Sequence, residues 1–544
     1  MINITEHIES RPYFQVLRTV GKVAERAGIE AYAVGGVVRD ALLDRETTDI
    51  DFVSVGQGSG IRLAKAVAKE LGGETVHVYE NFGTASVRVR EGQFDTSMQL
   101  EFVGARKESY RRDSRKPIVE EGTIEEDQRR RDFSINAMAI HLAPDRFGDV
   151  VDPFNGIADL EAGLLRTPLE PQTTFEDDPL RMIRGARFAA QLDFRISKDA
   201  FQAMTRQRDR VKILSQERIT EELQKIVCAK TPATGFRILF ETGLLNLILP
   251  ELADLQGVEA IDGRRHKDNF YHTLQVLQNL IEATSNRPCS DTEWLRWAAL
   301  LHDIGKPRTK RYSESAGWTF HGHEDVGSRM VKRVFRRLKL PLDERMEYVE
   351  KLVRLHHRPV ALVDDEVTDS AVRRLLFDAG DDIEDLMALV RADVTSKNPR
   401  RVRRYLAAFD RVEKKMTEVE EKDRLRQFQP PVDGHEIMQV LGVREGVEVG
   451  IAKNAIREAI LEGDIPNEYQ PAYDYLLGIK DETLRRGQLF HAVVRSLRGP
   501  EKRAIGAIKE HLFMGELPPD DDAAIECLMR IKEDALGAET TLHG

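Results

Sequence analysis

The sequence predicts an α/β domain at the N-terminal end of a long helical chain, and three observations lead to this fold class. Residues 31–55 read as an apolar strand, a glycine turn, a helix and a second strand, the order of a small α/β unit. From about residue 176 onward, apolar residues recur at spacings of three and four, as in amphipathic helices. The length of 544 residues exceeds one compact domain, so we expect several.

Within this frame, individual strands and helices can be assigned. Thr84 to Val89 and Gln99 to Val103 are β-rich runs that extend the sheet begun by Ile50 to Val55. Leu180 to Ala190 and Ile219 to Val227 show the helical period. We expect domain boundaries at two places. The first is at Pro250 with the polar stretch 262–269, and the second is at Pro430-Pro431, after a charged helix at 400–427.

The composition narrows the class of protein. With 41% hydrophobic and 32% charged residues and no apolar run of eighteen, the sequence favours a soluble protein and excludes a membrane span. The start MINITEHIES has no secretory signal, which predicts a cytoplasmic location. The net charge of -11 argues against nonspecific coating of nucleic acid, although runs such as Arg111-Arg112, Arg129-Arg131 and Arg400-Arg401 leave RNA as a partner.

The three cysteines, Cys228, Cys289 and Cys527, are scattered along the chain without the spacing of a metal site. This fits a reducing compartment, so we expect no disulfide and a role as buried apolar side chains.

A glycine turn, GGVVRD at residues 35–40, follows an apolar strand and opens a helix. Glycines let the backbone approach a phosphate group, and a helix N-terminus supplies amide donors. Gly35 and Gly36 are therefore candidate phosphate-binding residues, and Arg39 adds a charged fork. A tight connection without a ligand would use the same residues.

Two carboxylates, Asp49 and Asp51, stand at the start of the second strand. Side chains two residues apart on a strand point to the same face, so these carboxylates lie side by side and can hold a divalent metal. Without a metal, the pair would repel unless solvent or capping satisfied it. The glycine turn and the carboxylate pair together fit metal-assisted phosphoryl transfer.

The segment GGVVRDALLDRETTDIDFV at residues 35–53 resembles the signature of the class II tRNA nucleotidyltransferase and bacterial poly(A) polymerase family. The resemblance implies a polymerase-β-like nucleotidyltransferase head in which Asp49 and Asp51 are catalytic and hold Mg²⁺. It also implies that Gly36 and Arg39 hold the triphosphate. Glu101 occupies a place where related sequences carry another acidic residue, so we expect it at the same site.

Two further segments resemble motifs of this family. RRDFSINA at 130–137 resembles the motif in which an arginine and an aspartate, here Arg131 and Asp132, bind sugar and phosphate. ERITEELQKI at 217–226 resembles a neck-helix motif, to which we assign a structural role.

The segment DDPLRMIRGARF at 177–188 spaces one aspartate and three arginines along roughly one helix face. Aspartate and arginine three residues apart can offer an acceptor and donors to a base edge, although such a stripe is usually solvated. The segment resembles the family's E/D-D-x-x-R motif, with Asp177 where Glu is common. The resemblance implies that Asp178 and Arg181 recognise CTP or ATP, whereas Arg184 and Arg187 hold phosphate.

A second chemical signature, LLHDIGKP at 300–307, contains His302 and Asp303, with His272 before it and Asp393 after it. This order resembles the HD superfamily of metal-dependent phosphohydrolases. Imidazole and carboxylate ligands can hold a divalent cation, which lowers the pKa of a bound water molecule. This set of ligands does not distinguish Mg²⁺ from transition metals. Further candidate ligands are His321, His323, His356 and His357.

The C-terminal part offers RNA contacts but no chemistry. PPVDGHEIMQVLGVREGVEVG at 430–450 resembles a body-and-tail element of tRNA nucleotidyltransferases, with Arg444 and Lys453 as candidate phosphate contacts. We predict five domains: a nucleotidyltransferase head at 1–165, a helical nucleotide-recognition neck at 166–250, an HD domain at 251–400, a helical RNA-binding body and tail at 401–480, and a helical extension at 481–544.

The resemblance implies sequential transfer of CMP, CMP and AMP from CTP and ATP to the 3′ end of tRNA, with tRNA as partner and no membrane. Alternatives are a poly(A) polymerase, an enzyme that adds only CC or only A, an HD phosphohydrolase, or an RNA-binding protein with an inactive head. EFVGARKESY at 101–110 favours the tRNA branch, and the presence of Asp49, Asp51, Asp178 and Arg181 speaks against an inactive head. No oligomeric state is predicted.

Overall fold

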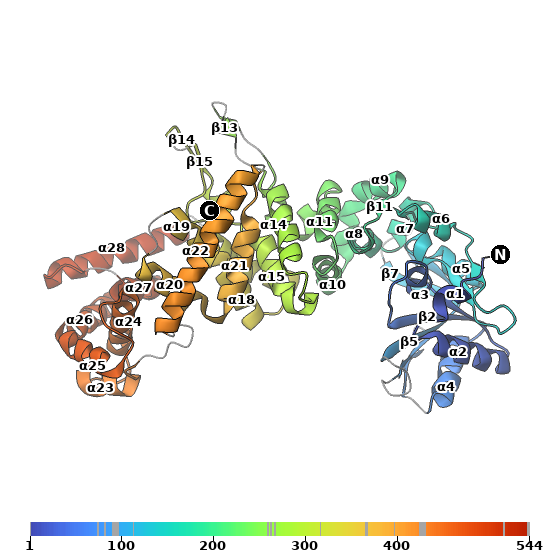
Figure 1. Ribbon diagram of the computed structural model, residues 1–544, viewed down its shortest axis with the longest axis horizontal. Helices are drawn as coiled ribbons and strands as arrows, with labels where there is room; N and C mark the ends of the chain where they lie inside the picture. The colour runs from blue at the N-terminus through green and yellow to red at the C-terminus, as the bar shows by residue number, and fades with distance from the viewer. Residues whose placement is uncertain are drawn as a thin grey trace. The chain divides into compact units, whose positions relative to one another are not determined.

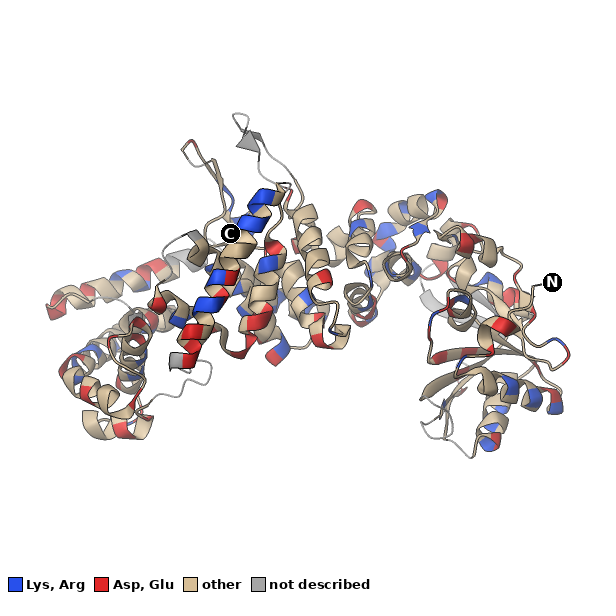
Figure 2. Cartoon of the chain, viewed as in Figure 1, with Lys and Arg blue, Asp and Glu red and all other residues tan. Residues whose placement is uncertain are grey.

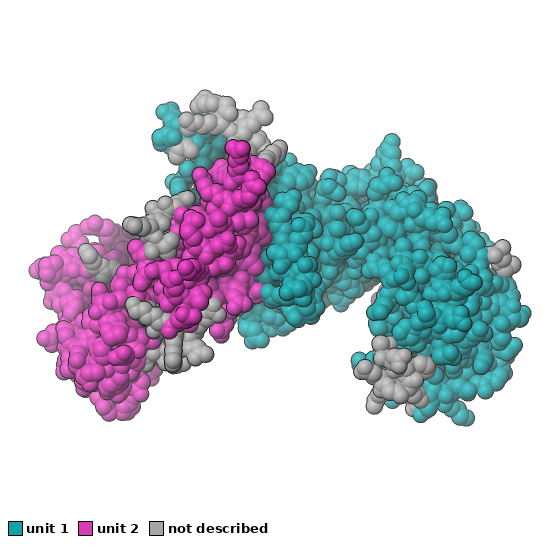
Figure 3. All heavy atoms as spheres, viewed as in Figure 1, with its two compact units in different colours: residues 1–353 teal, residues 354–544 magenta. Residues whose placement is uncertain are grey.

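The chain forms two compact units, residues 1–353 and 354–544 (Figure 3). The structure is a computed structural model, and each unit is described by itself. The residues described are 2–72, 75–80, 83–89, 97–111, 114–257, 260–261, 264–265, 268–315, 317–364, 368–396, 398–423, 431–514 and 517–540.

The predicted α/β head is present in the first unit (Figure 1). Seven of its strands form one sheet in the order β3-β4-β5-β2-β1-β8-β9. The strands are β1 (Glu30–Val34), β2 (Asp49–Val55), β3 (Val76–Tyr79), β4 (Thr84–Val89), β5 (Met98–Gly104), β8 (Ala139–His141) and β9 (Val150–Val151). Helices α2 (Phe14–Arg26) and α4 (Ser59–Glu70) pack on the sheet.

Strand β2 is central and fixes the site. It runs antiparallel to β1 and parallel to β5, which brings Asp51 level with Glu101. Phe52 of β2 stacks on Phe102 of β5 with ring centroids 4.8 Å apart, and both rings are buried. Because neighbouring residues of a strand point to opposite faces, Asp49, Asp51 and Glu101 share the other face.

The head is followed by a helical neck. Helix α8 (Leu180–Leu192) packs against α10 (Gln216–Val227) and α11 (Pro232–Glu241). Gly235 of α11 allows this close packing, because a Cβ there would lie 2.7 Å from the Ile226 side chain and 3.2 Å from the Ala186 carbonyl. The helical periods that predicted α8 and α10 are thus confirmed.

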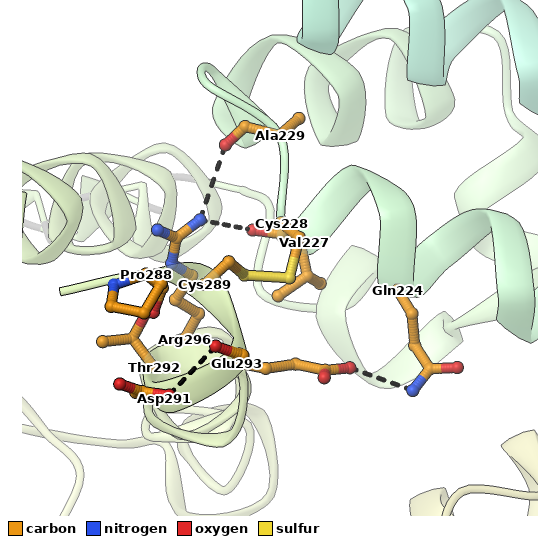
Figure 4. The surroundings of a disulfide bond; sticks show 11 residues. Gln224, Val227, Cys228, Ala229, Pro288, Cys289, Asp291, Thr292, Glu293 and Arg296 are labelled. Carbon is orange, nitrogen blue, oxygen red and sulfur yellow. Dashed lines mark hydrogen bonds between the residues drawn. A yellow bond between two sulfur atoms is a disulfide. The ribbon is translucent and has the colours of Figure 1, made fainter. Parts of the chain in front are cut away.

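The first unit continues with α14 (Asn269–Ala283), α15 (Cys289–Leu301) and α17 (His323–Leu338), the helices that bear the HD signature. The expectation that no cysteine pairs was wrong. Cys228, which caps α10, forms a disulfide with Cys289, the first residue of α15, with Cα atoms 5.6 Å apart (Figure 4). The Arg296 guanidinium donates to the Val227 carbonyl at 3.0 Å beside it. The disulfide therefore joins the neck to the helix that leads to His302.

The described residues of the second unit form helices joined by turns and loops, with no strand among them. It contains α20 (Asp369–Ala379), α21 (Ile383–Asp393), α22 (Pro399–Asp423), α23 (Gly434–Leu441), α24 (Val447–Glu462), α25 (Tyr469–Gly478), α26 (Lys480–Ser496), α27 (Ile505–Met514) and α28 (Asp521–Thr540). The predicted charged helix corresponds to α22, and the last part of its predicted span, 424–427, lies outside the described residues. None of the described helices combines the length and apolar character needed to cross a membrane.

Candidate active site

One cavity of about 640 Å³ in the first unit collects the predicted nucleotide-site residues of head and neck. Its lining includes all of the following: Gly35, Gly36, Arg39, Asp49, Asp51, Glu101, Arg131, Asp132, Asp178, Arg181, Arg184 and Arg187. These residues come from segments up to about 150 positions apart, so the fold brings together what the sequence showed only as separate motifs. Their individual roles stay predictions.

Three carboxylates occupy one side of the cavity. Asp49 and Asp51 lie on the same face of β2, and Glu101 lies level with Asp51 on β5. Burial raises the pKa of Asp51, with Asp49 adding to the shift and Arg131 opposing it. Burial, Asp51 and Asp49 likewise raise the pKa of Glu101. Within the described parts of the chain, no side chain forms an ion pair with these three carboxylates. A cation would relieve this repulsion.

The glycine turn begins α3 (Gly36–Leu42) directly beside these carboxylates. Gly35 has a φ of 77°, a conformation that side-chain-bearing residues rarely adopt. A Cβ on Gly35 would also lie 3.0 Å from an Arg131 nitrogen. Arg39 is fixed by two hydrogen bonds to Asp40, at 3.0 and 2.8 Å, and one to Asn136 at 2.7 Å. The turn therefore presents backbone amides next to a guanidinium that is already oriented.

Asp127 holds two arginines of the RRDFSINA segment. Its carboxylate is fully buried and accepts from Arg130 at 3.1 and 2.7 Å and from Arg131 at 3.2 and 3.1 Å. Burial by itself would raise the pKa of Asp127, but Arg131 and Arg130 lower it below its ordinary value. One buried carboxylate thus orients two of the cations that line the cavity.

Asp132 was predicted to bind sugar and phosphate, but its carboxylate already has protein partners. One oxygen accepts from Arg184 Nε at 2.7 Å, and the other accepts from the Asn136 side chain at 3.0 Å and the Phe133 amide at 2.8 Å. Burial opposes ionisation, yet Arg184 and Asn136 lower the pKa of Asp132 far below its usual range. The Asp132 carboxylate thus holds Arg184 at the cavity wall, and its predicted contact with sugar and phosphate stays a prediction.

The Phe188 ring of α8 is surrounded by guanidinium groups. Arg187 lies 4.3 Å from the ring centroid, and Arg39 and Arg184 each lie 5.3 Å from it. Arg187 is itself paired with Glu222 of α10 at 3.2 Å, and burial together with Arg184 lowers its pKa to about 10. Arg187 therefore remains charged at neutral pH.

The predicted base-recognition pair, Asp178 and Arg181, stands at the entrance of α8. Asp178 follows α7 (Pro171–Asp177), accepts from the Leu180 amide at 3.1 Å and pairs with Arg218 of α10 at 3.2 Å. Arg181 is 9% exposed and donates to two backbone carbonyls, Thr174 at 3.2 Å and Arg130 at 2.5 Å. The arginines of α8 are thus held by the protein and do not form a solvated stripe.

Sequence reasoning gave no role in the site to Asp127, Phe188, Arg218 or Glu222. The last two lie in the ERITEELQKI segment, whose structural role is consistent with their ion pairs to Asp178 and Arg187. The cavity has two chemically different sides. Asp49, Asp51 and Glu101 form no ion pair with any residue that the structure describes, while seven arginines are each hydrogen-bonded by the protein: Arg39, Arg130, Arg131, Arg181, Arg184, Arg187 and Arg218.

Comparison with known proteins gives matches over most of the chain. The family described as Poly A polymerase head domain matches residues 31–166, and the family described as probable RNA and SrmB-binding site of polymerase A matches residues 193–256. The HD domain family matches residues 269–396.

A curated relative of Deinococcus radiodurans, named A-adding tRNA nucleotidyltransferase, is 31% identical over 446 residues, which cover 80% of this chain and 92% of the relative. The chain belongs to the tRNA nucleotidyltransferase and poly(A) polymerase family. It is a nucleotidyltransferase with a polymerase-β-like head, as the sequence predicted.

Other members of the family match 58 to 80% of this chain. A CC-adding tRNA nucleotidyltransferase of Thermus thermophilus is 31% identical over 80% of this chain and 91% of the relative. A multifunctional CCA protein of Pseudomonas aeruginosa is 33% identical over 58% of this chain and 72% of the relative. A solved CCA-adding enzyme of Thermotoga maritima, complexed with tRNA, has the same fold, with a TM-score of 0.56, 20% identity and coverage of 88% of this chain and 99% of that chain.

The nucleotidyltransferase also carries a cluster of imidazoles around Asp303, which is almost fully buried. The Asp303 carboxylate lies 3.3 Å from His302 Nε2, 3.4 Å from His323 Nε2 and 3.7 Å from His272 Nε2. The Lys306 ammonium contacts the same carboxylate at 2.6 Å. Three predicted HD residues are therefore together, and His323, a further candidate, joins them.

Backbone carbonyls orient two of these rings. His302 Nδ1 lies 2.8 Å from the Ala299 carbonyl and His323 Nδ1 lies 2.9 Å from the Phe320 carbonyl, so in neutral rings Nδ1 carries the proton. Nε2 of each ring lies within 3.4 Å of the Asp303 carboxylate, and imidazole nitrogens beside a carboxylate are a donor set suited to the divalent metals that HD and nucleotidyltransferase domains typically use. Asp393 ends α21 in the second unit, and its part in this site stays a prediction, as do those of His321, His356 and His357.

Proposed function

We propose that this enzyme transfers CMP, CMP and AMP in sequence from CTP and ATP to the 3′ hydroxyl of tRNA. The observation that carries the proposal is that three carboxylates of the cavity, Asp49, Asp51 and Glu101, form no ion pair among the described residues, whereas its arginines are held by the protein. This is the arrangement that a metal-bound nucleoside triphosphate requires. The relatives named for A addition, CC addition and CCA synthesis support the choice of reaction.

In the proposed site, Asp49 and Asp51 would hold Mg²⁺, with Glu101 beside them. The ion would acidify the attacking hydroxyl and neutralise charge on the triphosphate. Arg39 and the amides that begin α3 would bind the triphosphate, and Arg184 and Arg187 would approach it from α8. The 3′ oxygen bonds to the α-phosphorus as the bond to the pyrophosphate oxygen breaks, so pyrophosphate leaves.

We assign recognition of the base to Asp178 and Arg181. Arg181 uses donors on two backbone carbonyls, which fixes the plane of its guanidinium, and Arg218 fixes the carboxylate of Asp178. A rigid donor and acceptor at the cavity wall can distinguish the base edges of C and A from those of G and U without a template.

The division of labour follows the predicted domains: head 1–165, neck 166–250, HD domain 251–400, RNA-binding body and tail 401–480 and extension 481–544. For the HD domain we propose metal-dependent hydrolysis of phosphate esters, because three imidazole Nε2 atoms converge on Asp303. The ion would be Mg²⁺ or a transition metal held by His272, His302, Asp303 and Asp393. A cytoplasmic location also stays a prediction.

The experiment supplies labelled CTP and ATP to purified enzyme with tRNA truncated before the first C, before the second C and before the A. Full CCA synthesis predicts extension of all three substrates to the same end. Addition only of A, or only of CC, would assign the enzyme to the partial activities of the relatives that cover most of the chain. Long homopolymers of A on unrelated RNA would support a poly(A) polymerase.

A further inference from the structure

Helix α22 in the second unit has a charge distribution opposite to the one that stabilises a helix. Its N-terminal half carries Arg400, Arg401, Arg403, Arg404 and Arg411, and its first turn has no acidic residue. Its C-terminal half is acidic, as Figure 2 shows by the change from blue to red along the helix. Because the N-terminus of a helix is the positive end of its dipole, the cations of the first turn, Arg400 and Arg401, are placed unfavourably.

Several charged residues in the middle and the C-terminal part of α22 form ion pairs, whereas the five arginines of its N-terminal half form none in the described ranges. Asp410 and Glu413 pair with Arg391 of α21 at 2.6 and 2.7 Å, and Asp369 of α20 pairs with Lys415 at 2.6 Å. No carboxylate in the described ranges pairs with any of the five arginines, all of which are exposed. Packing inside the unit therefore does not explain the basic half.

The five arginines form a defined surface. Residues 400, 404 and 411 are separated by four and seven positions, which aligns them along one side of the helix over about 16 Å. Arg401 and Arg404 also lie 5.7 and 5.6 Å from the centroid of the Tyr405 ring, which braces their guanidinium groups. We define this surface, Arg400, Arg401, Arg403, Arg404 and Arg411, as the α22 arginine stripe.

We propose that the α22 arginine stripe binds the phosphate backbone of the RNA substrate. The proposal rests on the function proposed above for the tRNA, and it names a surface for that partner. Arginine forks fit phosphate oxygens, and a row of them along one helix fits a strand that carries a charge on every residue. A bound anion would also offset the unfavourable position of Arg400 and Arg401 in the first turn of the helix.

An anionic membrane is a less suitable partner. A helix that lies on a membrane inserts an apolar face beside its basic face. The apolar side of α22, with Phe409, Val412, Met416 and Val419, is buried inside the unit. The stripe therefore offers charge without an apolar face to insert.

The test compares Arg400→Gln/Arg404→Gln with a matched control, Arg495→Gln/Arg530→Gln, which removes the same charge from other exposed positions of the second unit. Fluorescence anisotropy measures the Kd for tRNA lacking CCA, and for an unrelated RNA hairpin, between 50 and 200 mM salt. We expect the stripe variant to bind both RNAs about tenfold more weakly in 0.1 M salt. Its slope of log K against log salt should be shallower by about two.

A second measurement separates binding from a structural role. The melting temperature of the free stripe variant should be unchanged or higher, because two cations leave the positive end of the helix. Unchanged RNA affinity in the stripe variant, or an equal loss in the control, overturns the proposal. Loss of binding to phosphatidylglycerol vesicles with unchanged RNA binding also overturns it, in favour of a membrane.

The proposed function can fail separately. If wild-type enzyme binds tRNA through the stripe but adds neither CMP nor AMP, the stripe stands and the reaction is wrong. If the wild type adds CCA and the stripe variant binds tRNA as the control does, the reaction stands and the stripe is wrong.

Discussion

Two arginine-rich helices, α8 in the first unit and α22 in the second, use the same side chain in opposite ways. On α8, Arg184 and Arg187 pair with buried carboxylates, and Arg181 donates to backbone carbonyls. On α22, the arginines are exposed, and no carboxylate in the described part of the chain pairs with them.

This difference indicates how the arginines of each helix can recognise a ligand. A guanidinium that the protein already holds loses little conformational freedom on binding and has a defined plane, which suits selection between bases. An exposed guanidinium adjusts to whatever anion approaches and responds to salt, which suits affinity for a backbone without sequence choice. We therefore expect α8 to set nucleotide selection and α22 to set RNA affinity.

The largest effect is expected from the carboxylate side of the cavity. Asp51→Asn should lower the rate of addition with both CTP and ATP by about a thousandfold or more, because metal ligation contributes several kcal/mol whichever base is selected. Single-turnover assays with truncated tRNA measure this loss. Asp199→Asn, an exposed carboxylate of α9 (Lys198–Gln207), serves as control. Near wild-type rates in Asp51→Asn would remove Asp51 from the site.

The Cys228–Cys289 disulfide, which joins the neck to α15, is expected to stabilise the folded protein. The Cys228–Cys289 bond closes a loop with a sequence separation of 61, so reducing it should lower the free energy of unfolding by about 4 kcal/mol at 25 °C. Denaturant unfolding with and without dithiothreitol measures the change, and Cys228→Ser should match the reduced protein. Cys527→Ser, at the free cysteine, should behave as wild type. Identical midpoints for oxidised and reduced protein would contradict the expectation.

A substitution at Asp132 tests whether nucleotide binding requires the contact that holds Arg184 of α8 in place. Asp132→Asn keeps the shape of the side chain but removes the charge that holds Arg184, which should destabilise the protein by about 2 kcal/mol. It should also raise KM for CTP and ATP more than tenfold while tRNA affinity stays unchanged. An unchanged KM in a folded variant would mean that Arg184 needs no positioning.

The HD cluster should show the smallest effect on nucleotide addition. Asp303→Asn removes a buried carboxylate shared by His302 and His323, so metal-dependent hydrolysis of 2′,3′-cyclic or terminal phosphates should be lost. CCA addition should remain within about twofold of wild type, because the two sites use different residues. Hydrolysis should be tried with nickel, cobalt, manganese and magnesium. Loss of addition in the folded variant would show that the sites are coupled.

Local sequence patterns predicted much of the fold and the lining of the cavity. Alternation placed Asp49 and Asp51 on one strand face, the helical period found α8, and the glycine turn required the positive φ of Gly35. Each of these features depends on neighbouring residues, so a sequence can reveal it.

Pairings between distant residues could not be read in the same way. Arg184 meets Asp132 across 52 positions, Arg187 meets Glu222 across 35, and Cys228 meets Cys289 across 61. No periodicity links such positions, so the sequence could not show that the Asp132 carboxylate holds Arg184, and its predicted contact with the nucleotide stays a prediction. The expectation of unpaired cysteines failed for the same reason.

The most direct measurement compares variants of α8 and α22 in two assays, one for nucleotide selection and one for tRNA affinity. Arg181→Ala, its control Arg195→Ala at an exposed position, and Arg400→Gln/Arg404→Gln are each measured for selection of CTP and ATP over GTP and UTP and for the Kd of truncated tRNA. We expect Arg181→Ala to lower selectivity about tenfold to a hundredfold with unchanged Kd, because lost hydrogen bonds to a base edge affect selection. We expect the α22 variant to weaken tRNA binding with unchanged selectivity. If both variants change the same property, or if Arg181→Ala changes neither, the division between selection and affinity is contradicted.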